Sequence, residues 1–226
     1  MQNEKFDEYQ GQYAGQNEAF GAETGFPEQA GFRLTVSKLI VFACIGVFLY
    51  CDLIASQSTL NKIYSFASLY GPAVVQDGEY YRLLSYMFLH MGLNHVASNM
   101  ILIFFLGEEL ERFLGKWRFF FLYFSSGIVA GIVSIVYNIL DGNSVSSVGA
   151  SGAGFGLIGA TVCLLLADKS QRGTAFVKRV LLFAAISLYA GFSEQGIDNA
   201  AHVGGFLAGA AVTALLMVIR RRRVEG

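Results

Sequence analysis

One apolar stretch of the chain opens with Val148-Gly149-Ala150-Ser151-Gly152-Ala153-Gly154-Phe155-Gly156, and the last such stretch contains Asn199-Ala200-Ala201-His202-Val203-Gly204-Gly205. A hydroxyl and an imidazole thus stand near one end of two hydrophobic segments, and glycine follows each of them closely. An ionisable side chain is costly in hydrocarbon and marks a functional candidate by default. The pair therefore predicts a serine nucleophile and its base held inside a membrane.

The composition indicates a membrane protein. Of 226 residues, 54% are hydrophobic and 15% are charged, and the mean hydropathy is +0.49, whereas average soluble domains contain about 25% charged residues. Cys44, Cys51 and Cys163 fall inside apolar runs and do not suggest a disulfide framework. No basic surface is organised for nucleic acid, because the arginine run at 220–223 is better interpreted as a membrane flank.

Six apolar stretches predict an all-α polytopic membrane protein with six transmembrane helices, since about 20 apolar residues cross a bilayer core. The stretches are Leu39–Ala55, Tyr86–Leu106, Phe119–Leu140, Val148–Ala167, Phe176–Phe192 and Ala200–Ile219. The fifth is the weakest, because Lys178 and Arg179 interrupt its start. The second is interrupted by several polar residues, which become candidates for the site.

The distribution of basic residues indicates the topology, because Lys and Arg favour cytoplasmic connections. When the connections are numbered after each span, the even-numbered ones and the two terminal flanks hold fourteen of the sixteen Lys and Arg residues. The odd-numbered connections hold only Lys62 and Arg82. Both termini are therefore predicted to be cytoplasmic, in a protein that crosses the cell membrane several times.

The chain divides into two regions. Residues 1–32 hold six acidic residues and one basic residue without helical or strand periodicity, which predicts a disordered cytoplasmic tail. The spaced aromatic residues of this tail leave open a short recognition motif. An acidic leader before the first apolar run argues against a secretory signal peptide. Residues 33–226 form the predicted membrane domain, in which the external connection Ser56–Ser85 is expected to fold against the membrane surface.

The two reactive side chains are predicted to meet. Ser151 lies near the external end of the fourth span and His202 near the external end of the sixth, so both enter the membrane from the same face at a similar depth. Small residues repeat every four positions after each of them, and such repeats let two helices approach closely in lipid. These residues are Gly152, Gly156 and Ala160 in the fourth span, and Gly205 and Gly209 in the sixth. The alternative is generic helix packing, above all for Ala160 and Gly209.

The second span supplies candidate donors for an oxyanion. His95 and Asn99 are four residues apart and share a helical face, so together with the backbone N–H of Ser151 they predict an oxyanion hole. The alternative is that they only bond neighbouring helices. His90 is expected to organise the entry to this helix. A metal site built from the three histidines is a weak competitor, since no inward acid or cysteine joins them at ligand spacing; no metal and no cofactor are predicted.

Two further residues bear on the base. Phe155 follows Ser151 by four positions and therefore shares its helical face; it is predicted to carry the histidine ring, unless it is only a core aromatic. Asp198 precedes His202 by about one helical turn but is expected at the aqueous edge. A dyad, rather than a triad, is therefore predicted.

At this point the sequence resembles the rhomboid family of intramembrane serine proteases, in its compact six-helix bacterial form, over roughly residues 35–220. Gly149-Ala150-Ser151-Gly152 resembles the family's Gly-x-Ser-Gly, and Ala201-His202-Val203-Gly204-Gly205 with Gly209 resembles the segment that carries the base. His95-Val96-Ala97-Ser98-Asn99 resembles the His-x-x-x-Asn oxyanion motif. The resemblance identifies 33–226 as a membrane protease domain.

The chain also departs from the family pattern. Tyr81-Arg82 stands where Trp-Arg is frequent, and Phe155 stands where tyrosine is common. Glu111-Arg112 resembles an acidic–basic pair that is expected to be structural.

The resemblance implies a serine endopeptidase that cleaves the transmembrane segments of other membrane proteins, with the lipid bilayer as its surroundings and an active site open to the outside. Two other classes remain: a non-catalytic rhomboid-like protein that binds membrane helices, and a transporter or proton channel with His and Asn relays. The intact dyad argues against the first. The lack of internal repeats and of mid-membrane acids in the sequence argues against the second. The sequence assigns no oligomeric state and no natural substrate.

Overall fold

The computed structural model describes residues 34–167 and 197–225, with side chains up to residue 219. Residues Thr35–Gly226 form one unit of the chain. The tail predicted over 1–32 and the fifth predicted span, Phe176–Phe192, lie outside the described residues. The regular structure of the described part is helical apart from one pair of two-residue strands, which agrees with the predicted all-α class.

The elements follow one another along the chain in the order α2 (Val36–Leu49), the π-helix η1 (Tyr50–Ile54), α3 (Gln57–Ala67), β1 (Leu69–Tyr70), α4 (Gly71–Val75), α5 (Arg82–Ser85), the 3₁₀ turn η2 (Tyr86–Phe88), α6 (Leu93–Leu114), α7 (Lys116–Leu140), β2 (Ser146–Ser147), α8 (Ser151–Ala167) and α10 (Asn199–Glu225). The strands β1 and β2 pair in antiparallel fashion, with Leu69 opposite Ser147.

Several of these helices have the length and apolar character of membrane spans. Val36–Ile54, Lys116–Leu140 and Asn199–Ile219 qualify singly, and Arg82–Phe88 with Leu93–Leu114 would form a fourth span with a bend of 101°. Helix α8 is apolar but has only 17 residues. The described residues therefore give three or four spans, and the number six remains a prediction.

The second span differs from its predicted course. Instead of one helix over Tyr86–Leu106, a 3₁₀ turn ends at Phe88 and α6 begins only at Leu93. Gly92, immediately before α6, adopts a φ of +92°, a conformation that glycine reaches without steric cost. A helix cannot continue through such a residue, so the chain turns sharply here and places His90 in the bend.

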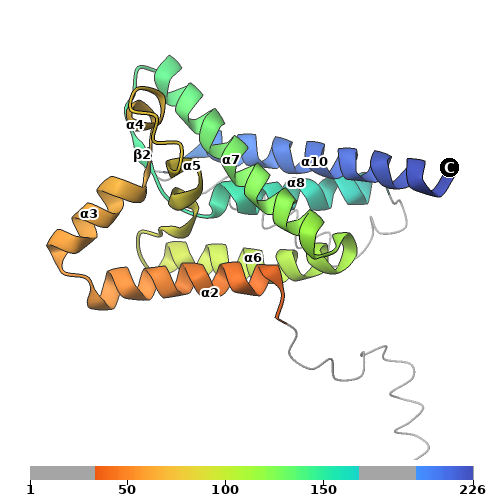
Figure 1. Ribbon diagram of the computed structural model, residues 1–226, viewed down its shortest axis with the longest axis horizontal. Helices are drawn as coiled ribbons and strands as arrows, with labels where there is room; N and C mark the ends of the chain where they lie inside the picture. The colour runs from red at the N-terminus through yellow and green to blue at the C-terminus, as the bar shows by residue number, and fades with distance from the viewer. Residues whose placement is uncertain (1–33, 168–196, 226) are drawn as a thin grey trace, which may run out of the picture. The chain divides into compact units, whose positions relative to one another are not determined.

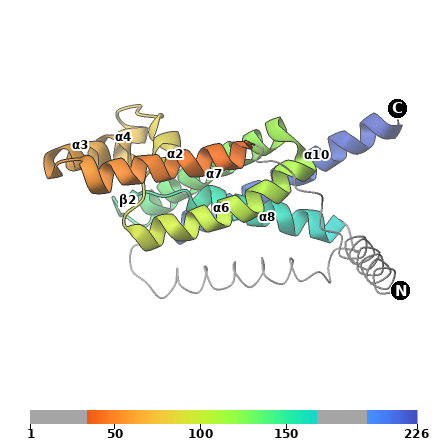
Figure 2. The ribbon, with the colours of Figure 1, turned by 90° about the horizontal axis from the view of Figure 1, so that it is seen from below.

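Helix α8 occupies the centre of the bundle. It packs against α10, α7 and α6, and Figure 1 shows α8 and α10 side by side with α7 crossing them. Helix α2 packs against α6, and Figure 2 shows these two helices running next to each other. Every residue of α8 from Gly152 to Thr161 is buried. Its neighbours therefore shield this helix over its first three turns.

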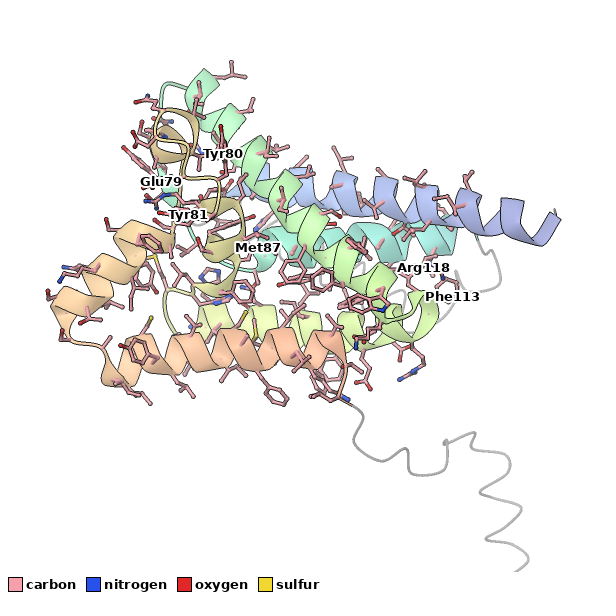
Figure 3. All side chains as sticks on the ribbon, in the orientation of Figure 1. Glu79, Tyr80, Tyr81, Met87, Phe113 and Arg118 are labelled. Atoms are coloured by element: carbon pink, nitrogen blue, oxygen red, sulfur yellow. The ribbon has the colours of Figure 1, made fainter. Side chains whose placement is uncertain are left out.

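The connection between the first two predicted spans, Ser56–Ser85, is folded, as its apolar residues predict. Its helix α5 begins with Arg82, a buried residue whose guanidinium donates to Ser68 O at 2.8 Å and pairs with Glu79 at 2.6 Å. Tyr81 stacks on Phe66 with ring centroids 4.7 Å apart. Figure 3 shows Glu79 and Tyr81 close together, and Met87 nearer the middle of the molecule. An aromatic–arginine pair thus ties the connection together, with tyrosine in the aromatic position.

The far end of α6 is joined to the start of α2 by a buried carboxylate. Glu111 accepts hydrogen bonds from the backbone N–H groups of Val36 and Ser37, at 2.9 and 3.0 Å. These N–H groups have no acceptor within their own helix, and a helix N-terminus favours an anion. Glu111 therefore has the structural role that the resemblance implied.

Candidate active site

The structure brings Ser151 and His202 together. Ser151 is the first residue of α8, and His202 lies one turn into α10. The Ser151 Oγ and the His202 Nε2 are 2.9 Å apart, within hydrogen-bond distance. Ser151 is half-buried and His202 is buried. A hydroxyl and a ring nitrogen from two helices 51 positions apart in sequence thus form one contact.

Glycines allow the two helices to come this close. A Cβ added at Gly205 of α10 would overlap the carbonyl oxygen of Gly152, and one added at Gly209 would overlap that of Gly156. Conversely, a Cβ at Gly159 of α8 would overlap the carbonyl of Phe206. The small residues predicted to form the helix contact therefore form it by direct backbone approach, which fixes the separation of Ser151 and His202.

The His202 ring lies on the Phe155 ring. Their centroids are 4.2 Å apart and their planes differ by 13°, so the rings are stacked. Phe155 is 3% exposed, and it lies one turn after Ser151 on α8. The face of the imidazole is therefore held by the same helix that supplies the hydroxyl.

The loop before Ser151 is fixed by its backbone. Gly149 has a φ of +127° and donates its N–H to Tyr86 O at 2.9 Å. The next N–H, that of Ala150, points at His90 Nε2 at 3.4 Å. His90 is 2% exposed, and it lies in the bend before α6. His90, expected from the sequence to support the site and to organise the entry to α6, thus also contacts the serine loop directly.

The backbone of His90 has a partner in the connection between α2 and α6. The Tyr64 hydroxyl of α3 donates to His90 O at 2.7 Å. Burial raises the pKa of this phenol, and Cys51 and Asp52 add to the shift, so the hydroxyl keeps the proton that it donates. The connection between α2 and α6 is therefore linked to the bend that carries His90.

The two predicted oxyanion donors lie at different points of the site. A Cβ added at Gly149 would be 2.7 Å from His95 Nε2 and 3.8 Å from Ser151 Oγ, so the His95 ring borders the serine loop. Asn99 is buried and donates its amide to His95 O at 2.8 Å. No hydrogen bond joins either side chain to Ser151 within the residues described.

Asp198 lies near the base without binding its ring. Its carboxylate accepts hydrogen bonds from Ser134 Oγ, from Ser147 Oγ at 2.6 Å and from the Ala201 N–H at 2.9 Å. The His202 Nδ1 is buried and has no hydrogen-bond partner in the described part of the chain. The geometry is that of a two-residue site. Sequence reasoning placed Asp198 at the aqueous edge and missed its serine partners, although an Asp just before an apolar helix is a helix-cap signal.

Comparison with known proteins identifies the family. A family model described as the Rhomboid domain matches residues 77–219. The chain belongs to the rhomboid family. This rhomboid is 29% identical over 182 residues to the rhomboid protease GluP of Bacillus subtilis, which covers 80% of this chain and 35% of GluP. It is 34% identical over 149 residues to the YdcA protein of the same organism, covering 66% of this chain and 73% of YdcA.

A third relative comes from a plant. RHOMBOID-like protein 5 of Arabidopsis thaliana is 40% identical over 139 residues, which covers 60% of this chain and 44% of that protein. This rhomboid therefore spans about a third of the length of GluP and less than half of the plant relative. With its apolar helices, the chain is a multi-pass membrane protein of a family that includes serine proteases.

Proposed function

We propose that this rhomboid is an intramembrane serine endopeptidase that cleaves transmembrane segments of other membrane proteins with a Ser151–His202 dyad. One observation carries the proposal: the serine hydroxyl and the imidazole Nε2 are 2.9 Å apart. A nucleophile within hydrogen-bond distance of a base is the signature of covalent catalysis. The protease names of GluP and of a fungal rhomboid-type serine protease support the same reading.

The proton moves between these two side chains. When Ser151 Oγ attacks the scissile carbonyl carbon, the hydroxyl proton passes to His202 Nε2. The imidazolium then gives this proton to the departing amine, and the substrate's acyl group remains on the serine. A water molecule, deprotonated by the same nitrogen, hydrolyses the ester and restores the hydroxyl. No metal and no organic cofactor takes part in these steps.

The charge that develops on the carbonyl oxygen requires hydrogen-bond donors. Ser151 is the first residue of α8, so its backbone N–H has no acceptor in its own helix and lies at the positive end of the helix dipole. The His95 ring borders the same loop, and Asn99 is one turn further along α6. We assign the oxyanion hole to these three groups.

The orientation follows from the charge distribution. Fourteen of the sixteen Lys and Arg residues belong to one side, so both termini are cytoplasmic and the site opens to the outside, where water is available. The partners of the protein are the bilayer and the membrane proteins that it cleaves.

The test is cleavage of a model transmembrane substrate in lipid vesicles. Ser151→Ala and His202→Ala are expected to abolish cleavage while the protein stays folded. Ser125→Ala is the matched control, because among the described residues Ser125 Oγ bonds only to Leu122 O, within its own helix; its rate should equal that of the wild type. Retained cleavage by Ser151→Ala would overturn the proposed function.

A further inference from the structure

The carboxylate of Asp198 joins three separate parts of the site. Its Oδ1 accepts from the Ala201 N–H in the first turn of α10, next to His202. Its Oδ2 accepts from Ser147 Oγ of β2 and from Ser134 Oγ of α7. Asp198 is half-buried, so these bonds form largely away from water.

Each of the three partners lies where movement would disturb the dyad. Ser147 precedes Ser151 by four residues and belongs to the loop that delivers the nucleophile. Ala201 precedes His202 directly, so its position sets the start of the helix that carries the base. Ser134 belongs to α7, which packs against both α8 and α10. One carboxylate therefore links the serine loop, the N-terminus of α10 and helix α7.

We propose that Asp198 is a positioning residue of the protease: it fixes the serine loop to the N-terminus of α10 and so sets the geometry of Ser151 and His202. This inference rests on the proposed function. Asp198 acts through other residues, because its oxygens are taken by the two serines and the Ala201 N–H, and no hydrogen bond joins it to the imidazole.

The physical chemistry favours this arrangement. Hydrogen bonds to an ionised carboxylate are stronger than neutral ones, and a negative charge at a helix N-terminus is stabilised by the helix dipole. Asn138, one turn further along α7, donates to Ser134 O at 2.9 Å and to Ser134 Oγ at 3.4 Å, and so adds a donor to the Ser134 hydroxyl. In catalysis a misplacement of about 1 Å costs up to about 100-fold in rate. Loss of the Asp198 hydrogen bonds should therefore lower kcat measurably.

Four variants test the proposal by kcat and KM for a transmembrane substrate and by the rate at which a fluorophosphonate probe labels Ser151. All are measured at a temperature where each variant is fully folded. Asp198→Ala is expected to lower kcat and the labelling rate about tenfold or more, with KM within about twofold of the wild type. A role in stability alone would lower the unfolding temperature and leave kcat of the folded protein unchanged.

The second variant separates hydrogen bonding from charge. In Asp198→Asn the carbonyl oxygen still caps the Ala201 N–H, and the amide donates to the two serine hydroxyls, which also accept. This variant is expected to recover kcat to within about fivefold of the wild type, since the bonds persist in neutral form. A loss as large as that of Asp198→Ala would overturn positioning by hydrogen bonds.

The third and fourth variants ask whether the groups act as one unit. The double variant Ser134→Ala/Ser147→Ala should lower kcat. The triple variant, with Asp198→Ala added, should have a kcat no lower than that of Asp198→Ala alone, because residues of one network are not additive. Additive losses would overturn the proposal.

Thr35→Ala is the matched control: Thr35 also caps a helix, through Lys38 N, but at the α2 end that contacts Glu111. Its kcat should not change.

The outcomes also separate this proposal from the one on which it rests. An active wild type whose Asp198→Ala variant keeps kcat within about twofold overturns only the role of Asp198. Cleavage by Ser151→Ala, or an inactive wild type, overturns the proposed function and the positioning role with it.

Discussion

Phe155 and His202 are stacked face to face, with ring centroids 4.2 Å apart and planes that differ by 13°. Because the His202 Nδ1 has no hydrogen-bond partner among the described residues, no carboxylate fixes the orientation of this imidazole. The flat contact with Phe155 and the hydrogen bond between Nε2 and Ser151 Oγ are the interactions that orient it. In the proposed dyad, the aromatic ring would thus orient the imidazole as a third residue does in a triad.

Replacing Phe155 should therefore affect turnover more than substrate binding. Phe155→Leu removes the flat surface but keeps much of the volume, and we expect kcat to fall about tenfold through misorientation of the base. Phe155→Tyr keeps the ring and should stay within about threefold of the wild type. The measurement is kcat and KM on a transmembrane substrate in vesicles. Equal rates for the Leu and Tyr variants would show that the ring does not orient His202.

The oxyanion assignment predicts a loss in kcat from two residues of α6. His95→Ala and Asn99→Ala should each slow turnover about tenfold or more, since removal of a single oxyanion donor in other enzymes costs at least that. KM should change little, because these donors act in the transition state. Asn61→Ala is the control: Asn61 is an exposed amide of α3 whose one side-chain bond within the described residues is accepted from Gln57. Unaltered rates in both α6 variants would leave these residues as scaffold.

Gly149 offers a comparison of backbone strain with local crowding. Gly149 and Gly142 both have positive φ, +127° and +70°, so alanine at either is strained, at a cost on the order of 1–3 kcal/mol. Only at Gly149 would the new Cβ press on His95, at 2.7 Å from Nε2; at Gly142 nothing lies within 4 Å. Both variants should unfold at lower temperature, but only Gly149→Ala should lose kcat, about tenfold or more. A similar loss of kcat in Gly142→Ala would show that backbone strain, and not contact with His95, lowers kcat.

The sequence was informative wherever a short-range rule applies. Spacing along one helix predicts that Phe155 shares a face with Ser151, and the structure places that ring on His202. The repeat of Gly205 and Gly209 predicts close helix contact, and the backbone approach to Gly152 and Gly156 has that form. Hydropathy and three short motifs led to the rhomboid family, which the family model confirms.

What the sequence did not reveal depends on contacts between distant segments. The break at Gly92 requires a positive φ, and the sequence does not mark which of its 26 glycines adopts one. The bonds from Ser134 and Ser147 to Asp198 join residues 64 and 51 positions apart, and serine in an apolar helix ordinarily bonds its own backbone. The contact of His90 with the Ala150 N–H requires that the bend already exist. Such links follow from packing, and local pattern does not encode them.

The final prediction concerns the helix contact that supports the site. In Gly205→Ala the new Cβ would overlap the Gly152 carbonyl, and a backbone group cannot rotate away, so α8 and α10 must separate. We expect a loss of about 1–3 kcal/mol in the free energy of unfolding, with a fall in kcat because Ser151 and His202 move apart. Gly46→Ala is the matched control: Gly46 lies inside α2 and nothing lies within 4 Å of its added Cβ. That variant should gain about 0.5–1 kcal/mol, the usual benefit of alanine over glycine in a helix. Unfolding in detergent micelles measures both, and a Gly205→Ala protein as stable as Gly46→Ala would mean that the two helices do not meet through their backbones.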